Sequence, residues 1–191
     1  MIPIEQNVLI KTRKLDNENH MKSINKHLEI STKDNLHLQM TAAHCDRTKW
    51  NMHEISASYE LLGNAAIDFA QKFSQGDTDE AGNPRTMNFK VDQMWGLIYK
   101  EGSHTDVHHH WPSIWSFTYC VKACDSCAPL LFPTTVGKYR QYFVAPEVGQ
   151  ITLFPGHVHH SVPKQKCKHE RIMIAGNIIM DGWNEGTNRN G

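Results

Sequence analysis

The sequence predicts a mainly β fold with helices at its N-terminus, an α+β chain in which a helical layer supports a β-barrel or sandwich. The first half carries one clear helical pattern. After it come short runs rich in β-branched and aromatic residues, each bounded by turn residues. The 191 residues suit one domain with a buried core. We expect a helical support region over residues 1–85, a β core over 86–182 and a polar tail over 183–191.

The helical layer rests on two segments. Asn17–Leu28 predicts a short helix with weak periodicity. Met52–Phe73 gives a stronger signal, because its apolar side chains recur at steps of three and four and so share one helical face. These side chains are Ile55, Tyr59, Leu62, Ala66, Phe69 and Phe73. The helix is expected to pack this face on the core.

The β core begins after an exposed loop, Gln75–Arg85, which is rich in Gly, Asp, Asn and Pro. Seven runs follow, and their order is typical of antiparallel strands in a sandwich or barrel. They are Asn88–Lys100, Ile114–Val121, Pro129–Phe132, Tyr139–Ala145, Gln150–Phe154, His159–Pro163 and Arg171–Ile179.

Composition and charge argue against several classes of partner and location. Twenty basic and twenty acidic residues cancel, so the net charge favours neither nucleic acid nor an anionic membrane. No stretch reaches the roughly 18 apolar residues that cross a bilayer. The N-terminus turns polar after Ile10 and lacks the apolar centre of a secretory signal. An odd number of cysteines, five, argues against an extracellular disulfide scaffold. We therefore expect a cytoplasmic protein without a membrane partner.

Histidines are the unusual feature, since eight of the thirteen lie between His104 and His169. Imidazole is the commonest protein ligand of mid-series metals. Residues two apart on a strand share one face, so His108 and His110 point the same way if the chain is extended there. Pro112 cannot donate to a ladder and places the end of that strand near Trp111.

A third metal ligand has to come from another strand. His160 is the best placed, because it begins an apparent strand just after the Pro155-Gly156 turn. Three protein ligands on one face leave open positions, as non-haem iron(II) oxygenases require. His104 and Asp106 form a rival His-x-Asp pair, the commoner half of a two-histidine, one-carboxylate triad. The residues alone leave both possibilities open.

The order of these segments resembles the 2-oxoglutarate- and iron(II)-dependent oxygenase superfamily, and most closely a short branch found in bacteria and in phages of marine cyanobacteria. The resemblance covers about residues 88–180. It rests on His108-His109-His110-Trp111-Pro112, on Ser116-Phe117-Thr118-Tyr119, on Gly149 through Phe154-Pro155, on His160-Ser161-Val162, and on Arg171 and Asn177.

The resemblance implies a double-stranded β-helix, or jelly roll, that binds iron(II) through His108, His110 and His160. It further implies that Arg171, eleven residues after His160, binds 2-oxoglutarate, since a planar guanidinium can pair both oxygens of a carboxylate. Tyr99 and Ser116 are expected as secondary cosubstrate contacts. The site then uses dioxygen and hydroxylates an unknown substrate, for which a protein or peptide side chain is one candidate. A phage-encoded enzyme would act in the host cytoplasm.

His110 departs from the family pattern, because a carboxylate usually stands there. Two rival functions therefore stay open. One is a cupin-like three-histidine iron dioxygenase that does not use 2-oxoglutarate, in which Arg171 would be dispensable. The other is a non-enzymatic jelly-roll protein that binds zinc.

The cysteines suggest a second metal site. Cys124 and Cys127 form a CxxC, and Cys167 and His169 form a CxH. If their two loops meet, these four residues could bind a structural zinc ion. Ordinary reduced cysteines are the alternative, and no thioredoxin-like βαβ pattern supports a redox pair.

Overall fold

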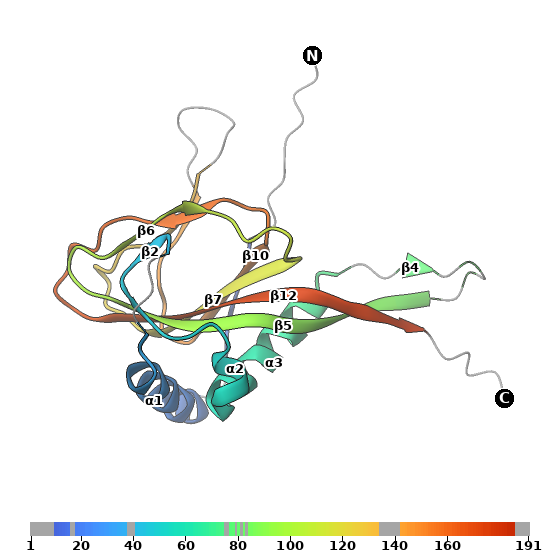
Figure 1. Ribbon diagram of the computed structural model, residues 1–191, viewed down its shortest axis with the longest axis horizontal. Helices are drawn as coiled ribbons and strands as arrows, with labels where there is room; N and C mark the ends of the chain where they lie inside the picture. Colours follow the sequence, from blue (N-terminus) through green and yellow to red (C-terminus); the bar gives the residue numbers. More distant parts are fainter. Residues whose placement is uncertain are drawn as a thin grey trace, which may run out of the picture.

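Two antiparallel sheets face each other, and three helices cover the outer face of the larger sheet (Figure 1). The computed structural model describes residues 10–15, 18–37, 41–74, 77–78, 80, 82, 84–133 and 142–185. This architecture confirms the predicted mainly β fold with N-terminal helices.

The chain alternates between the two sheets, which is how a jelly roll is built. The larger sheet has the order β1 (Lys11–Lys14), β10 (Gln150–Pro155), β7 (Trp115–Lys122), β12 (Arg171–Glu185), β5 (Pro84–Tyr99) and β3 (Asp46–Arg47), with β4 (Asp77–Thr78) also on β5. The smaller sheet has the order β2 (Ala43–His44), β6 (His104–His108), β11 (His160–Val162), β8 (Leu130–Phe132) and β9 (Tyr142–Val144).

Both faces of the larger sheet are covered, so its central strands are buried almost throughout. On β7, Phe117 and Tyr119 pack in the core shared with the helices, whereas Cys120 packs in the core between the two sheets. The period-two alternation of a strand divides these side chains between the two cores. The face toward the smaller sheet carries Ser116 and Thr118, and there a cavity opens.

The helices are α1 (Glu18–Asp34), α2 (Met52–Ile55) and α3 (Ala57–Gln71). The continuous helix expected over Met52–Phe73 is wrong at one point, because Ser56 is extended, with φ −128° and ψ 120°. Its carbonyl accepts the amides of Tyr59 and Glu60 and starts α3. Ile55 therefore lies on the separate helix α2 and is exposed. The rest of the expected apolar face, from Tyr59 to Phe69, is buried.

Residues before position 85 also contribute strands, since β1 and β3 extend the larger sheet and β2 edges the smaller one. β12 runs through Glu185, into the region expected as a polar tail. The limits of the three proposed regions stay predictions. Residues 186–191, part of the loop Gln75–Arg85 and the start of the strand Tyr139–Ala145 lie outside the described residues. None of the described helices combines the length and apolar character that crossing a bilayer requires.

Gly96 on β5 lets the helical layer approach the sheet. The Thr32 hydroxyl donates to the Leu28 carbonyl (2.7 Å) and lies 2.6 Å from the Tyr59 hydroxyl, so α1 and α3 meet over this glycine. A Cβ at Gly96 would lie 2.6 Å from the Thr32 methyl and closer still to the Tyr59 oxygen. Any side chain here must push the helices away from the sheet.

We expect Gly96→Ala to lower the free energy of unfolding by about 1–3 kcal/mol, the usual range for overpacking a core. Urea denaturation measures this directly. Thr32→Ser removes the clashing methyl, so the double variant should lose less than the sum of the two single losses. Additive losses, or a Gly96→Ala protein as stable as the wild type, would contradict this account of the interface.

Candidate metal centre and cavity

The metal centre is built on the pairing of β6 with β11. His160 pairs with His108, and Val162 pairs with Thr105, so one more residue lies between the pairs on β6 than on β11. This β-bulge shifts the alternation of side chains. Thr105 and His108, three residues apart, both face the cavity. Asp106 between them points outward, with 61% of its side chain exposed.

His110 lies just beyond the end of β6 and is fixed by the chain on both sides. Its amide donates to the Gly156 carbonyl (2.7 Å), and its own carbonyl accepts the Ser113 amide (2.9 Å). A Cβ at Gly156 would collide with the Ser113 backbone, so this turn requires glycine. The turn before β11 thereby holds His110 next to His160.

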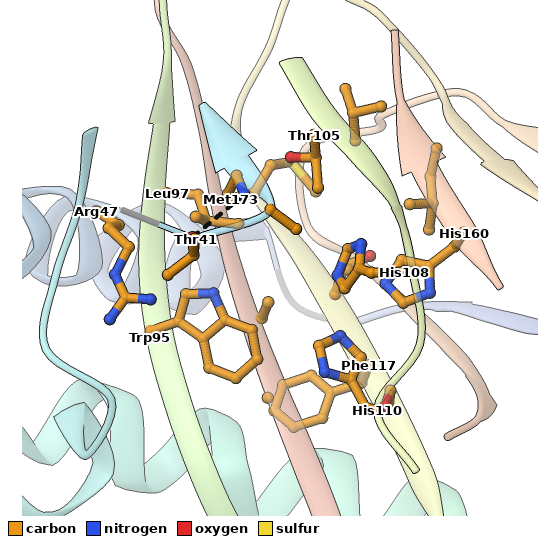
Figure 2. Close-up of a pocket in the computed structure, with 18 of the residues that line it drawn as sticks. Thr41, Arg47, Trp95, Leu97, Thr105, His108, His110, Phe117, His160 and Met173 are labelled. Carbon is orange, nitrogen blue, oxygen red and sulfur yellow. Dashed lines mark hydrogen bonds between the residues drawn. The ribbon is translucent and has the colours of Figure 1, made fainter. Parts of the chain in front are cut away.

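The three imidazoles that the sequence singles out meet at one side of the cavity (Figure 2). The ring centroids of His108 and His160 are 4.3 Å apart. The ring centroid of His110 lies 4.9 Å from that of His108 and 5.0 Å from that of His160. One ring nitrogen from each residue lies within 4.8 Å of the other two. Small side-chain rotations would let the three nitrogens share one ion.

Two of these imidazoles are held in the tautomer that a metal needs. Nδ1 of His108 lies 2.8 Å from the Asp106 carbonyl, and Nδ1 of His160 lies 3.0 Å from the Val158 carbonyl. A carbonyl only accepts, so each Nδ1 carries the proton and each Nε2 keeps its lone pair.

Burial keeps the three rings neutral. It lowers the pKa of His110 to about 4 and also lowers the pKa of His108. Burial, with His108 nearby, holds the pKa of His160 well below the ordinary histidine value. Three neutral nitrogen donors are therefore available at neutral pH, which suits a divalent transition metal.

Arg171 is the second polar feature of the same cavity, which has a volume of about 210 Å³. The residue is 2% exposed, and its guanidinium lies 4.8 Å from the centre of the Tyr99 ring. Among the described residues, its Nε and Nη1 have no hydrogen-bond partner. An unpaired buried cation is strongly unfavourable, so this one fits an anionic ligand such as a carboxylate.

Tyr99 and Ser116, the expected secondary contacts, also line the cavity. The Tyr99 hydroxyl lies 2.7 Å from the Thr105 hydroxyl, and burial raises the pKa of Tyr99, which keeps the phenol neutral. Ser116 donates to the Asn177 side-chain oxygen (3.0 Å). Their cosubstrate roles stay predictions, because both hydroxyls already have partners within the protein.

Sequence reasoning missed the cavity residues of the first half, above all Arg47. This arginine is 2% exposed, stacks over Trp50 at 3.7 Å and donates from Nε to the Thr48 carbonyl (3.2 Å). Figure 2 shows Arg47 and Trp95 across the cavity from the histidines. Arg47 lies on the two-residue strand β3, which is too short to show any periodicity in the sequence.

The rival pair His104 and Asp106 gathers elsewhere, with His44 from β2. The His44 Nε2 lies 2.9 Å from one Asp106 carboxylate oxygen, and the His104 Nε2 lies 3.8 Å from the other. The rings of His44 and His104 stack at 4.3 Å. None of the three lines the cavity, so the structure does not bring this pair to His160.

The sulfur atoms of Cys124, Cys127 and Cys167 also come together, as the sequence suggested. The His169 side chain does not join them, and only its carbonyl oxygen lies near the Cys167 sulfur, at 3.8 Å. The structure therefore brings together three of the four expected residues, and their binding of zinc stays a prediction.

Comparison with known proteins gives a likeness in structure alone, since no family model and no curated protein matches the sequence. A prolyl-4-hydroxylase from Pseudomonas putida superposes with a TM-score of 0.66 at 11% identity, over 92% of this chain and 95% of that one. A viral collagen prolyl hydroxylase from Paramecium Bursaria Chlorella virus-1, in a 2-oxoglutarate complex, gives 0.60 at 12% identity, over 92% and 98%.

HygX from Streptomyces hygroscopicus, bound to nickel, 2-oxoglutarate and hygromycin B, gives a TM-score of 0.65 at 10% identity, over 92% of this chain and 84% of that one. These likenesses confirm the jelly-roll fold. They extend over most of each chain, including the N-terminal half.

The low pKa of His110 has a consequence for the metal-free protein. The unfolded chain takes up a proton near pH 6.5, whereas the folded chain resists it down to about pH 4. Stability therefore falls as pH decreases through this window. We expect His110→Gln, which cannot take up that proton, to lose less stability between these two pH values. Urea titrations with a chelator present measure the two slopes, and equal slopes would contradict a buried neutral His110.

Proposed function

We propose that this chain is an iron(II)- and 2-oxoglutarate-dependent oxygenase that binds the metal through His108, His110 and His160 and the cosubstrate's distal carboxylate through Arg171. One observation carries the proposal. The buried Arg171 guanidinium has no hydrogen-bond partner on two of its nitrogens within the described part of the chain, and it shares a cavity with three neutral imidazoles. That combination matches a ligand with a metal-chelating end and an anionic end.

The donor set fits the proposed metal. Imidazole nitrogen is a suitable ligand for iron(II), and three protein ligands on one face leave positions for a chelating cosubstrate and dioxygen. When bound, the iron supplies the activation of dioxygen, coupled to oxidation of 2-oxoglutarate to succinate and carbon dioxide. The protein's own residues bind, orient and shield the reacting groups.

Arg171 is suited to orient the cosubstrate because its surroundings are dry and its position is fixed. It begins β12, where it pairs with Tyr99 on β5, so its backbone is anchored within the larger sheet. The aromatic ring of Tyr99 lies against the guanidinium. In such a low-dielectric site a two-pronged pairing with a carboxylate is strong and directional.

The remaining walls exclude water. Trp95, Leu97, Met173 and Val162 line the cavity, and the first three are among the labelled side chains of Figure 2. Trp95 is 5% exposed and lies against His110, with ring centroids 5.7 Å apart. This apolar part of the wall protects a reactive centre beside the imidazole nitrogens from solvent.

The reaction we propose is hydroxylation of a C–H bond in a primary substrate. The structural neighbours' own ligands differ widely, from a hypoxia inducible factor peptide to hygromycin B. Because function is carried by the site rather than the fold, a peptide side chain remains one candidate class. The equal numbers of acidic and basic residues give no support for nucleic acid.

The direct test is 2-oxoglutarate binding by calorimetry under anaerobic conditions, with iron(II) loaded. We expect Arg171→Ala to weaken binding by about 30-fold or more, since truncating one member of a buried charge pair costs about 2–5 kcal/mol. Arg171→Lys should be intermediate, because it keeps the charge and loses the planar fork.

Arg47→Lys is the matched control, since Arg47 lines the same cavity but is stacked on Trp50. It should bind 2-oxoglutarate nearly as the wild type does. Loss of 2-oxoglutarate binding in Arg47→Lys, with normal binding in Arg171→Ala, would contradict the proposal. It would show that Arg47 and not Arg171 binds the distal carboxylate. Iron-dependent oxygen consumption without any 2-oxoglutarate binding would favour the cupin-like alternative. Zinc bound by His108, His110 and His160, with no oxygen consumption on adding iron, would favour a binding protein.

A further inference from the structure

A second cluster of metal-binding side chains lies outside the cavity. Cys124 and Cys127 come from the loop between β7 and β8, and Cys167 comes from the loop between β11 and β12. Their sulfur atoms form a nearly equilateral triangle. The distance from Cys124 to Cys127 is 3.5 Å, from Cys124 to Cys167 3.7 Å, and from Cys127 to Cys167 3.5 Å.

This triangle has the size that a tetrahedral zinc ion requires. Zinc–sulfur bonds of about 2.3 Å at tetrahedral angles place the sulfur atoms about 3.8 Å apart. A disulfide would need about 2.05 Å, and the structure joins none of the five cysteines in one. The three sulfur–sulfur distances are nearly equal. A redox-active pair of cysteines with an unrelated third cysteine nearby would instead show one short distance and two longer ones.

The surroundings donate hydrogen bonds to the sulfur atoms. The side-chain amide of Gln165 donates to Cys127 (3.2 Å) and to Cys167 (3.1 Å), and the backbone amide of Cys124 donates to Cys127 (3.3 Å). N–H groups pointing at sulfur stabilise the thiolate form and are the usual outer contacts of a metal site.

Gln165 itself is held rigidly, which makes it an independent sign of a built site. It is 2% exposed, and its side-chain oxygen accepts the Ala128 amide (2.8 Å). Its backbone amide donates to Ser103 and its carbonyl accepts from Gly102, each at 2.8 Å. The accepted bond to Ala128 orients the amide, so its NH2 group must face the sulfur atoms.

We propose that Cys124, Cys127 and Cys167 bind one zinc ion as three thiolates, with Gln165 donating hydrogen bonds to two of them. On binding, each thiol loses its proton to solvent and the ion keeps its oxidation state. The His169 side chain lies outside the group and is not among the proposed ligands. Soft thiolates favour zinc, whereas imidazole is a suitable ligand for several metals that include iron(II), so the two clusters differ in ligand chemistry.

The ion would join two loops far apart in sequence at the start of β12. Cys167 lies four residues before Arg171, and the loop of Cys124 and Cys127 leads into β8 of the facing sheet. The site is structural on this account, because it crosslinks the two sheets next to the arginine without touching the cavity.

Elemental analysis and cobalt(II) substitution of the full chain test the proposal. We expect wild-type protein, purified without chelator, to hold one zinc ion that is retained in His108→Ala/His160→Ala. Cobalt in that double variant should show the intense near-ultraviolet absorption of thiolate-to-cobalt charge transfer. Cys124→Ser and Cys167→Ser should lose both the zinc and this absorption, whereas Cys45→Ser, which changes a cysteine outside the cluster, should keep both.

Two further variants guard against misfolding and a wrong ligand set. Gln165→Leu leaves all three thiols in place and should weaken zinc retention against a competing chelator while the fold, followed by circular dichroism, is kept. His169→Ala should keep zinc fully. A thiolate-free cobalt spectrum, zinc that disappears with the histidines, zinc loss in His169→Ala, or an intact mass two hydrogens lighter without reductant would each overturn the three-thiolate site.

Discussion

The antiparallel pairing of β6 with β11 is the constraint on which the candidate metal centre depends. It places His108 opposite His160, although the two lie far apart in the chain, and the bulge beside this pair decides which side chains face inward. If the side chains of β6 alternated regularly, His104, Asp106 and His108 would all face the smaller sheet's inner side, toward the cavity. The bulge instead turns Asp106 to solvent and Thr105 to the cavity. The bulge thus keeps Asp106 away from the three histidines that meet at the cavity.

The cavity concentrates groups that a folded protein normally avoids burying without partners. Three imidazoles are held neutral by burial, and a guanidinium lies over an aromatic ring with two nitrogens free of hydrogen bonds within the described chain. Each arrangement is unfavourable until a ligand binds, because these polar groups lose their contacts with water when the chain folds and gain partners only from the ligand. The larger sheet, with helices behind it and a continuous apolar core, provides the stability that tolerates this site. Stability and binding are thus assigned to opposite faces of the same strands.

The fold and the triad could be predicted because their signals are local or depend on spacing. Strand runs bounded by turn residues predicted the β half. The separations among His108, His110, His160 and Arg171 predicted the candidate centre once their order was seen to resemble a known family. Arg171 illustrates the limit: its place in the cavity follows from that spacing, but its lack of a partner is visible only in three dimensions. Three features could not be predicted from the sequence: the extended backbone at Ser56, the bulge in β6 and the position of Arg47. Each depends on one backbone angle, one pairing register or a two-residue strand.

A crystal structure of the protein with iron(II) and 2-oxoglutarate, grown without oxygen, tests the central claim most directly. The account predicts one metal ion on His108, His110 and His160, with 2-oxoglutarate chelating it and its far carboxylate paired with Arg171. A metal ion held by His44, His104 and Asp106 instead, or a cosubstrate carboxylate bound away from Arg171, would contradict it.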